Sequence, residues 1–243
     1  ALGHGMTTAQ RMRRRVGTAL AARGYVEVLT YPFVGDEELD SLRIGDADPR
    51  RSRIRLANPL SDKQPLLRAS LLPGLIAAAR RNLGRGSTDL RIFEIGRLFR
   101  GALGGPIPRP SVADAPTDAD WVALNAQLPE QPIAVSAVLT GELVPQGWWG
   151  AARAVDWADS IDAARVVVDA LGLVLEVRKG NDPAFHPGRC AVLVVDGVEM
   201  GVAGELHPRV IEALELPARS CAMELDLDAC LGGIGGCPHA PGA

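Results

Sequence analysis

The sequence predicts an α+β fold, in which helices cover a largely antiparallel sheet. Apolar residues recur at helical spacing in several segments, while other segments alternate apolar and polar residues or form short apolar runs typical of strands. The two kinds of segment do not follow one another in the regular strand–helix–strand order of a parallel sheet. The chain has 243 residues, 47% of them hydrophobic, which is enough to bury a sizeable core.

The first expected helix runs from Thr8 to Ala22. Thr7 or Thr8 can cap it through a side-chain hydroxyl, and Gly24 can end it. Its apolar stripe consists of Met12, Val16, Ala19 and Leu20. The following residues, 25–31, are rich in β-branched and aromatic side chains and predict a strand that ends at Pro32.

Two helices and a strand are expected next. A short helix is predicted at Asp36–Leu42, and Ser70 can cap a longer helix that ends near Asn82. The residues "RIFEIGRLFR", within Leu90–Arg100, alternate like a buried strand, with Phe93, Ile95 and Phe99 on one side and Ile92 and Leu98 on the other.

The second half of the chain predicts more sheet. A strand is expected at Ile133–Thr140, and a helix at Asp159–Leu171 can end at Gly172. Asp196-Gly197 accepts the positive φ angles of a tight hairpin turn between two apolar runs. The remaining expected elements are a short helix after Pro208 and a strand near Ser220–Leu227.

These elements predict one module, at residues 8–229, and a flexible C-terminal tail at 230–243. The proline-bearing segment 101–120 is expected to be an irregular, mobile loop within the module. No apolar run approaches the roughly 20 residues that a membrane span requires, so we expect a cytoplasmic protein.

Charge is distributed unevenly along the chain, although the net charge is only −3. Residues 1–100 hold 18 Lys and Arg against 10 Asp and Glu, whereas residues 101–243 hold 8 against 19. Arginines cluster at 11–15, 50–55 and 80–85. These clusters could bind phosphate or an acidic partner surface, and a solvated surface is the alternative.

Two groups of residues were considered as a catalytic site and as a metal site. His186 and His207, with Glu205, could form an acid–base pair, but each histidine precedes a proline, which favours a structural role in a turn. Cys230, Cys237 and His239 lack the usual zinc-ligand spacing, so a zinc site is not expected.

Two segments resemble the signatures of class II aminoacyl-tRNA synthetases. "RGYVEVLTYPF" and the helix before it resemble the first signature, and "LRIFEIGRLFRG" resembles the first strand of the second. In that family an arginine followed by an acid holds the ATP phosphates and the activated carboxylate. Arg100 is the nearest match to that arginine, but Gly101 follows it and the acid is missing. The glycine-rich residues 232–236, where the third signature would lie, are not followed by its arginine.

A more specific resemblance is to the β subunits of bacterial phenylalanyl-tRNA synthetases. Six stretches in family-like order carry it: "RGYVEVLTYPF", "NPLSDKQPLLRASLLPGLIAAARRN", "RIFEIGRLF", "FHPGRCAVLVVDG", "GVAGELHP" and "MELDLDA". The resemblance implies a class II synthetase-like antiparallel sheet flanked by helices, without an active site, packed against a catalytic α subunit in an (αβ)2 heterotetramer. It also implies that this chain is a fragment, and that the helix at Thr8–Ala22 and the strand at 25–31 lie at a subunit interface.

The resemblance further implies that the chain has no catalytic, cofactor-binding or metal-ligating residue of its own. ATP and Mg²⁺ would be used by the whole enzyme, and tRNA(Phe) would bind the assembled enzyme. Two alternatives remain open. One is a stand-alone ATP-dependent ligase that uses Arg68, Arg97 and Arg100, and the other is a nucleic-acid-binding module that uses the basic N-terminal half.

Overall fold

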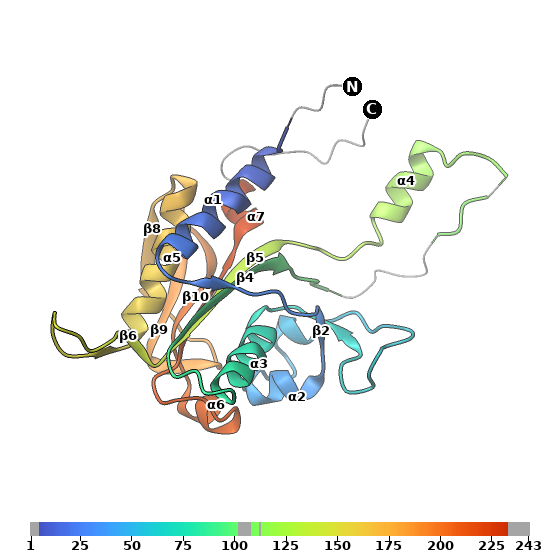
Figure 1. The fold of residues 1–243 in the computed structure, drawn as a ribbon. Helices are drawn as coiled ribbons and strands as arrows, with labels where there is room; N and C mark the ends of the chain where they lie inside the picture. The colour runs from blue at the N-terminus through green and yellow to red at the C-terminus, as the bar shows by residue number, and fades with distance from the viewer. Residues whose placement is uncertain (1–4, 102–107, 112, 233–243) are drawn as a thin grey trace.

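A seven-stranded sheet forms the centre of the computed structural model, which describes residues 5–101, 108–111 and 113–232 (Figure 1). Along the sheet the strands are β1 (Val26–Glu27), β4 (Leu90–Arg97), β5 (Ile133–Thr140), β11 (Cys221–Asp226), β10 (Val198–Leu206), β9 (Phe185–Val195) and β8 (Leu175–Lys179). Each neighbouring pair is antiparallel except β1 and β4, which run parallel. The α+β prediction with a largely antiparallel sheet is therefore confirmed.

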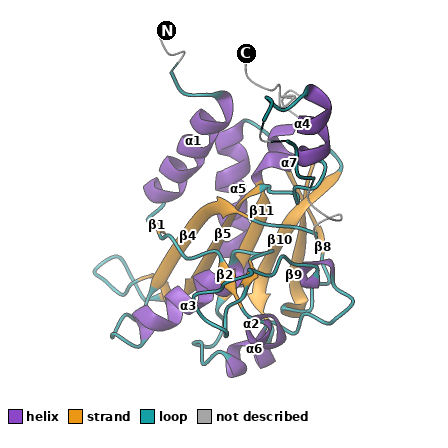
Figure 2. Cartoon of the chain, turned by 90° about the vertical axis from the view of Figure 1, so that its right-hand side faces the viewer, coloured by secondary structure: helices purple, strands orange, loops and turns teal. Residues whose placement is uncertain are grey.

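Helices cover the sheet from two sides. One hydrophobic core joins α1 (Thr8–Ala22) and α5 (Trp157–Leu171) to the sheet residues that include Phe93 and Ile95. The other joins α2 (Asp36–Ser41), α3 (Leu72–Leu83) and α6 (Pro208–Ala213) to the sheet residues that include Ile92 and Leu98. Figure 2 shows α1 and α5 toward the upper part of the molecule and α2, α3 and α6 toward the lower part. The predicted alternation of β4 thus places its successive side chains in two separate cores, one on each face of the sheet.

Smaller elements complete the described chain. A two-stranded sheet pairs β2 (Phe33–Val34) with β3 (Leu66–Leu67), and a hairpin pairs β6 (Glu142–Val144) with β7 (Arg153–Ala154). The short helices are the 3₁₀ turn η1 (Pro49–Arg51), α4 (Asp118–Asn125) and α7 (Leu227–Gly232). Among the described residues no helix is long and apolar enough to cross a membrane.

Local rules explain where the long helices start and stop. The Thr7 hydroxyl accepts a hydrogen bond from the backbone N–H of Gln10, and the Gln10 side chain accepts one from Thr7 N–H in return. Helix α5 ends at Gly172, whose φ of +77° is the left-handed conformation that favours glycine. The Asp196-Gly197 turn has φ angles of +50° and +79° and closes the β9–β10 hairpin as predicted.

The structure corrects three expectations. The strand predicted at 25–31 is reduced to the two residues of β1, because beyond them only the Val28 N–H still donates to β4, at Phe93 O. Segment 101–120 contains the start of α4, which was missed, and its residues 102–107 and 112 lie outside the described part. The tail predicted at 230–243 begins inside α7, and its residues 233–243 also lie outside the described part.

Candidate functional site

A row of polar side chains crosses three strands on the sheet face that packs against α3. Glu94 of β4 is paired in register with Ser136 of β5, and Ser136 is paired with Glu224 of β11. Glu94 is 1% exposed and Ser136 is fully buried, where its hydroxyl donates to Met223 O at 2.7 Å. A carboxylate in such a place must be paired or hydrogen-bonded, because its desolvation is costly.

Arg68 and Thr30 satisfy the Glu94 carboxylate. The Arg68 guanidinium approaches Glu94 Oε1 with Nη1 at 2.7 Å, and the Thr30 hydroxyl donates to Glu94 Oε2 at 2.6 Å. Arg68 Nε also donates to Arg97 O at 3.0 Å. Gly96 leaves room for this cluster, since a Cβ there would lie 2.3 Å from Arg68 Nη2. The cluster ties the segment after β1 to strand β4.

The side-chain carboxylate of Glu224, on β11, lies at the start of α3. Its Oε2 accepts hydrogen bonds from Leu71 N–H at 2.7 Å and from the Ser70 hydroxyl at 3.0 Å, while Ser70 Oγ accepts one from Leu72 N–H. Ser70 thus accepts from one N–H of the first turn, but the N-cap position of α3 is Leu71, one residue later than predicted. Burial raises the pKa of Glu224, although the bonds from Leu71 and Ser70 and the nearby charges of Arg50 and Arg100 oppose that rise.

The raised pKa of Glu224 predicts a pH-dependent contribution to stability. A carboxyl whose pKa is higher in the folded chain than its ordinary value of 4.5 stabilises the fold fully below that value and loses this contribution as the pH rises through the folded pKa. Glu224→Gln keeps an acceptor for Leu71 and removes the charge. The unfolding free energy of the variant, relative to the wild type, should therefore increase as the pH rises above 4.5 and level off once the pH exceeds the folded pKa of Glu224. Parallel pH profiles in urea denaturation would contradict this.

Each of the three arginines considered for ATP binding is engaged elsewhere. Arg100 pairs through Nη1 with Asp226 Oδ2 at 2.7 Å, and its backbone N–H donates to Glu130 O. Arg97 Nη1 donates to Gln131 O at 3.0 Å, and Arg68 is held by Glu94. Asp226 comes from the distant strand β11, so the sequence around Arg100 carried no sign of this partner. The arginines do not converge on one open site.

The two histidines and Glu205 do not form an acid–base pair in the structure. His186 Nδ1 accepts a hydrogen bond from Gly188 N–H and His207 Nδ1 accepts one from Arg209 N–H, so each histidine stabilises its own turn. The buried Glu205 carboxylate lies 3.3 Å from the guanidinium of Arg189. Burial, with Arg43, Arg209 and His186 nearby, lowers the pKa of His207. These contacts support the structural role that the prolines favoured.

Among the residues that the structure describes, no group of three possible metal ligands is found. Cys237 and His239 lie outside that part of the chain. Cys230 is buried at the start of the tail, and burial raises the pKa of its thiol to about 11.

The three arginine clusters differ in their surroundings. In the second cluster, Arg50 pairs with Asp48 and Asp182, while Arg51 and Arg53 pair with Asp36. In the third, Arg80 pairs with Glu215. The first cluster, at 11–15, lies on α1, a helix that contains no acidic residue. Of the three clusters, the one on α1 has the strongest unbalanced positive charge.

The edge beyond β1 exposes large apolar side chains. Leu29 and Tyr31 are each 82% exposed, whereas Thr30 between them points to Glu94. The Tyr31 and Phe33 rings stack with centroids 6.3 Å apart. The apolar stripe of α1, in contrast, is used inside the chain, because Val16 and Leu20 are fully buried in the first core. Val16 and Leu20 are therefore not available to a partner chain, whereas the β1 edge, formed by Val26, Leu29 and Tyr31, is uncovered in the described chain.

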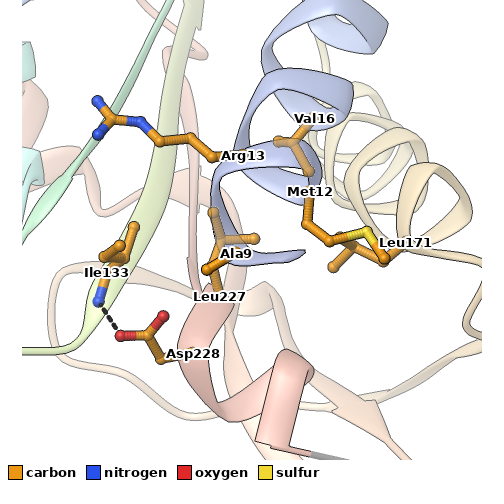
Figure 3. Close-up of a pocket in the computed structure, with 8 residues that line it drawn as sticks. All are labelled: Ala9, Met12, Arg13, Val16, Ile133, Leu171, Leu227 and Asp228. Carbon is orange, nitrogen blue, oxygen red and sulfur yellow. Dashed lines mark hydrogen bonds between the residues drawn. The ribbon is translucent and has the colours of Figure 1, made fainter. Parts of the chain in front are cut away.

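A small pocket lies between α1, β5, α5 and α7 (Figure 3). Its walls are mainly apolar, and Asp228 closes one side by accepting a hydrogen bond from Ile133 N–H at 2.9 Å. The cavity measures about 10 Å³, which is near the smallest volume that holds one water molecule. This pocket is a packing gap and has no room for a substrate.

The fold defines the class of protein. A crystal structure of pyrrolysyl-tRNA synthetase from Desulfitobacterium hafniense matches with a TM-score of 0.63 and 17% identity, over 93% of this chain and 69% of that chain. A structure of PylSc, a pyrrolysyl-tRNA synthetase from the same organism, matches with a TM-score of 0.62 and 16% identity. The chain has the fold of a class II aminoacyl-tRNA synthetase core.

Sequence comparison identifies the family. The family model described as "Phenylalanyl tRNA synthetase beta chain CLM domain" matches residues 1–227. The phenylalanine–tRNA ligase β subunits of Thermobifida fusca and Streptomyces avermitilis are each 49% identical, over 93% of this chain. The chain belongs to the phenylalanyl-tRNA synthetase beta chain CLM domain family. It spans 28% of the length of these two relatives.

Proposed function

We propose that the chain is a non-catalytic core module of a phenylalanine–tRNA ligase β subunit. It supports assembly with a catalytic α subunit, and the assembled cytoplasmic enzyme uses ATP and Mg²⁺ to charge tRNA(Phe). The observation that carries this proposal is the family match over residues 1–227. The surroundings of Arg100 support the non-catalytic part, and the exposed β1 edge supports the assembly part.

Adenylate formation requires cations that neutralise the phosphates of ATP during displacement at the α-phosphate. Arg100, at the position that resembles the second signature, is already neutralised by Asp226. The open hollow beside it is also lined by Glu199, whose carboxylate repels a triphosphate. Arg68 is buried under the sheet face with Glu94. These charges oppose ATP binding by the isolated chain.

An assembly role accounts for the apolar β1 edge. Strand β1 is the edge strand of the seven-stranded sheet, and Val26 within it and Leu29 and Tyr31 just beyond it are exposed. An uncovered edge with large apolar side chains is a site for pairing with another chain. The Thr30 contacts to Glu94 and Arg68 hold this segment in place before a partner arrives, which lowers the entropy cost of binding. We assign the α subunit as the chain that covers this edge.

The test of the non-catalytic role is pyrophosphate exchange with phenylalanine, ATP and Mg²⁺. We expect the purified chain to show no exchange above background, even at high protein concentration, because its candidate phosphate-binding arginine is paired. Arg100→Ala should leave that background unchanged. Exchange by the wild type that disappears in Arg100→Ala would instead establish the stand-alone ligase.

A further inference from the structure

We propose that Thr30 and Arg68 are positioning residues, which hold the exposed side chains of Leu29 and Tyr31 in the orientation that a partner chain binds. The inference rests on the proposed function, in which an α subunit covers the β1 edge, and it deepens that function by naming the residues that fix the geometry of the edge. The observation that carries it is a side-chain bridge that begins where strand pairing stops.

Residues 29–32 have few backbone hydrogen bonds to the rest of the described chain. Strand β1 pairs with β4 over two residues, and Val28 N–H donates one further bond to Phe93 O at 2.8 Å. The next backbone bond lies at the far end of the segment, where Arg68 N–H donates to Pro32 O at 2.9 Å. Between these two bonds, side chains have to fix the direction in which the residues point.

Arg68, which follows β3 directly, bridges this gap. Its Nη1 donates to Thr30 Oγ1 at 3.0 Å and to Glu94 Oε1 at 2.7 Å, and its Nε donates to Arg97 O at 3.0 Å. The Thr30 hydroxyl in turn donates to Glu94 Oε2 at 2.6 Å. The backbone N–H of Phe99 donates to Arg68 O at 2.9 Å. Arg68 thus ties the edge segment to β4 and to the residues that continue it.

The inward contact of Thr30 decides where its two neighbours point. Thr30 is half-buried and bonded to Glu94, whereas Leu29 and Tyr31 are each 82% exposed. This is the alternation of an extended chain, in which successive side chains point to opposite sides. The Tyr31 ring is oriented further by its stack on Phe33, with the two ring planes 8° apart. Release of Thr30 would therefore let both exposed side chains turn away from their present direction.

Two glycines leave room for the bridge. A Cβ at Gly74, on α3, would lie 2.4 Å from Thr30 Oγ1, and a Cβ at Gly96, on β4, would lie 2.3 Å from Arg68 Nη2. Within a helix glycine is less favourable than alanine, so Gly74 lowers the stability of α3 while it admits Thr30. The Thr30 hydroxyl sits in a niche of fixed shape between α3 and β4.

Stability alone is a poor explanation for such a bridge. Arg68 and Glu94 are 6% and 1% exposed, and apolar side chains of similar size often replace a buried ion pair without loss. Hydrogen bonds, unlike apolar contacts, have a preferred direction. The bridge can hold the exposed edge in one orientation, which an apolar core at the same place would not do.

Order parameters from NMR relaxation of the 243-residue chain test the positioning step without a partner. We expect the N–H groups of Leu29 and Tyr31 to have values of about 0.85 in the wild type and below about 0.6 in Thr30→Val, which keeps the shape and removes the hydroxyl. Thr30→Ser keeps the hydroxyl and should behave like the wild type. The matched control is Thr140→Val, because Thr140 is buried on β5 and accepts a hydrogen bond from Ser220 Oγ at 3.0 Å. An equally rigid edge in Thr30→Val would overturn the proposal.

Affinity for a phenylalanine–tRNA ligase α subunit links positioning to assembly. Thr30→Val should weaken the complex by about tenfold, because two freed side chains must be ordered again on binding, whereas Thr30→Ser and Thr140→Val should bind like the wild type. In a chain that carries Leu29→Ala and Tyr31→Ala, Thr30→Val should cause no further loss, since the side chains that it holds are gone. Equal losses in both backgrounds would show a purely structural role for Thr30 and overturn the proposal.

The double variant Glu94→Leu with Arg68→Met separates orientation from stability. It should keep most of the stability of the wild type, yet bind the α subunit about tenfold more weakly, because the bridge to Thr30 is lost. A stable double variant with wild-type affinity would overturn the proposal. If the wild-type chain forms no complex at all, the proposed function fails, and order parameters that fall in Thr30→Val but not in Thr30→Ser still uphold the positioning role.

Discussion

Glu94→Ala should lower the free energy of unfolding by about 3–5 kcal/mol, because it leaves the buried guanidinium of Arg68 without its carboxylate. Thr30 would lose its acceptor in the same change. An unpaired charge that is buried in this way costs far more than the lost attraction alone. Urea denaturation, followed by circular dichroism at neutral pH, measures the loss.

A double variant shows whether the stability lost in Glu94→Ala comes from the unpaired charge or from the lost packing. Glu94→Leu with Arg68→Met replaces both charges by apolar side chains of similar size, which is often neutral for a buried pair. We expect the double variant to regain most of the stability that Glu94→Ala loses. A double variant as unstable as the single one would show that the ion pair is not the reason for the loss.

Leu20→Asp should unfold the chain, whereas Tyr31→Asp should not. Leu20 is fully buried between α1 and the sheet, so the aspartate removes apolar contacts and buries a charge, at a combined cost of more than about 4 kcal/mol. That is a large part of the total stability of about 5–15 kcal/mol of a typical domain. Tyr31 is 82% exposed, and a change there should alter stability by no more than about 0.5 kcal/mol.

Circular dichroism and thermal melting of the two variants check this contrast. A folded Leu20→Asp variant with the melting temperature of the wild type would show that α1 does not belong to the core in solution. An unfolded Tyr31→Asp variant would show that the β1 edge is covered by the chain itself. Either result would require a different assignment of the partner surface.

The elements that were predicted correctly depend on short-range rules. The Thr7 cap of α1, the end of α5 at Gly172, the Asp196-Gly197 turn and the alternation of β4 are each set by residues close together in the sequence. The missed helix α4 had such a signal, the reciprocal cap at Thr117 and Asp120, but it followed a proline-rich stretch that favoured a loop. Local sequence therefore predicted most of the fold.

The candidate site depended on contacts that local sequence does not encode. Glu94, Ser136 and Glu224 form one row only because β4, β5 and β11 pair in a particular register, and their spacing along the chain gives no sign of it. The signal that was available was an acid in the middle of the buried strand "RIFEIG". In the same way, Asp226 reaches Arg100 from a strand far along the chain. Pairing register decides which charges neutralise one another.

The most direct test of the assembly role is sedimentation velocity of this chain mixed with a phenylalanine–tRNA ligase α subunit. We expect a complex with the wild-type chain, and a complex weakened by about tenfold or more with the folded variant Tyr31→Asp, since a charge would replace an apolar contact at the β1 edge. The matched control Trp148→Asp changes another highly exposed aromatic residue, on the β6–β7 hairpin, and should bind like the wild type. Absence of any complex with the folded wild-type chain would contradict the account.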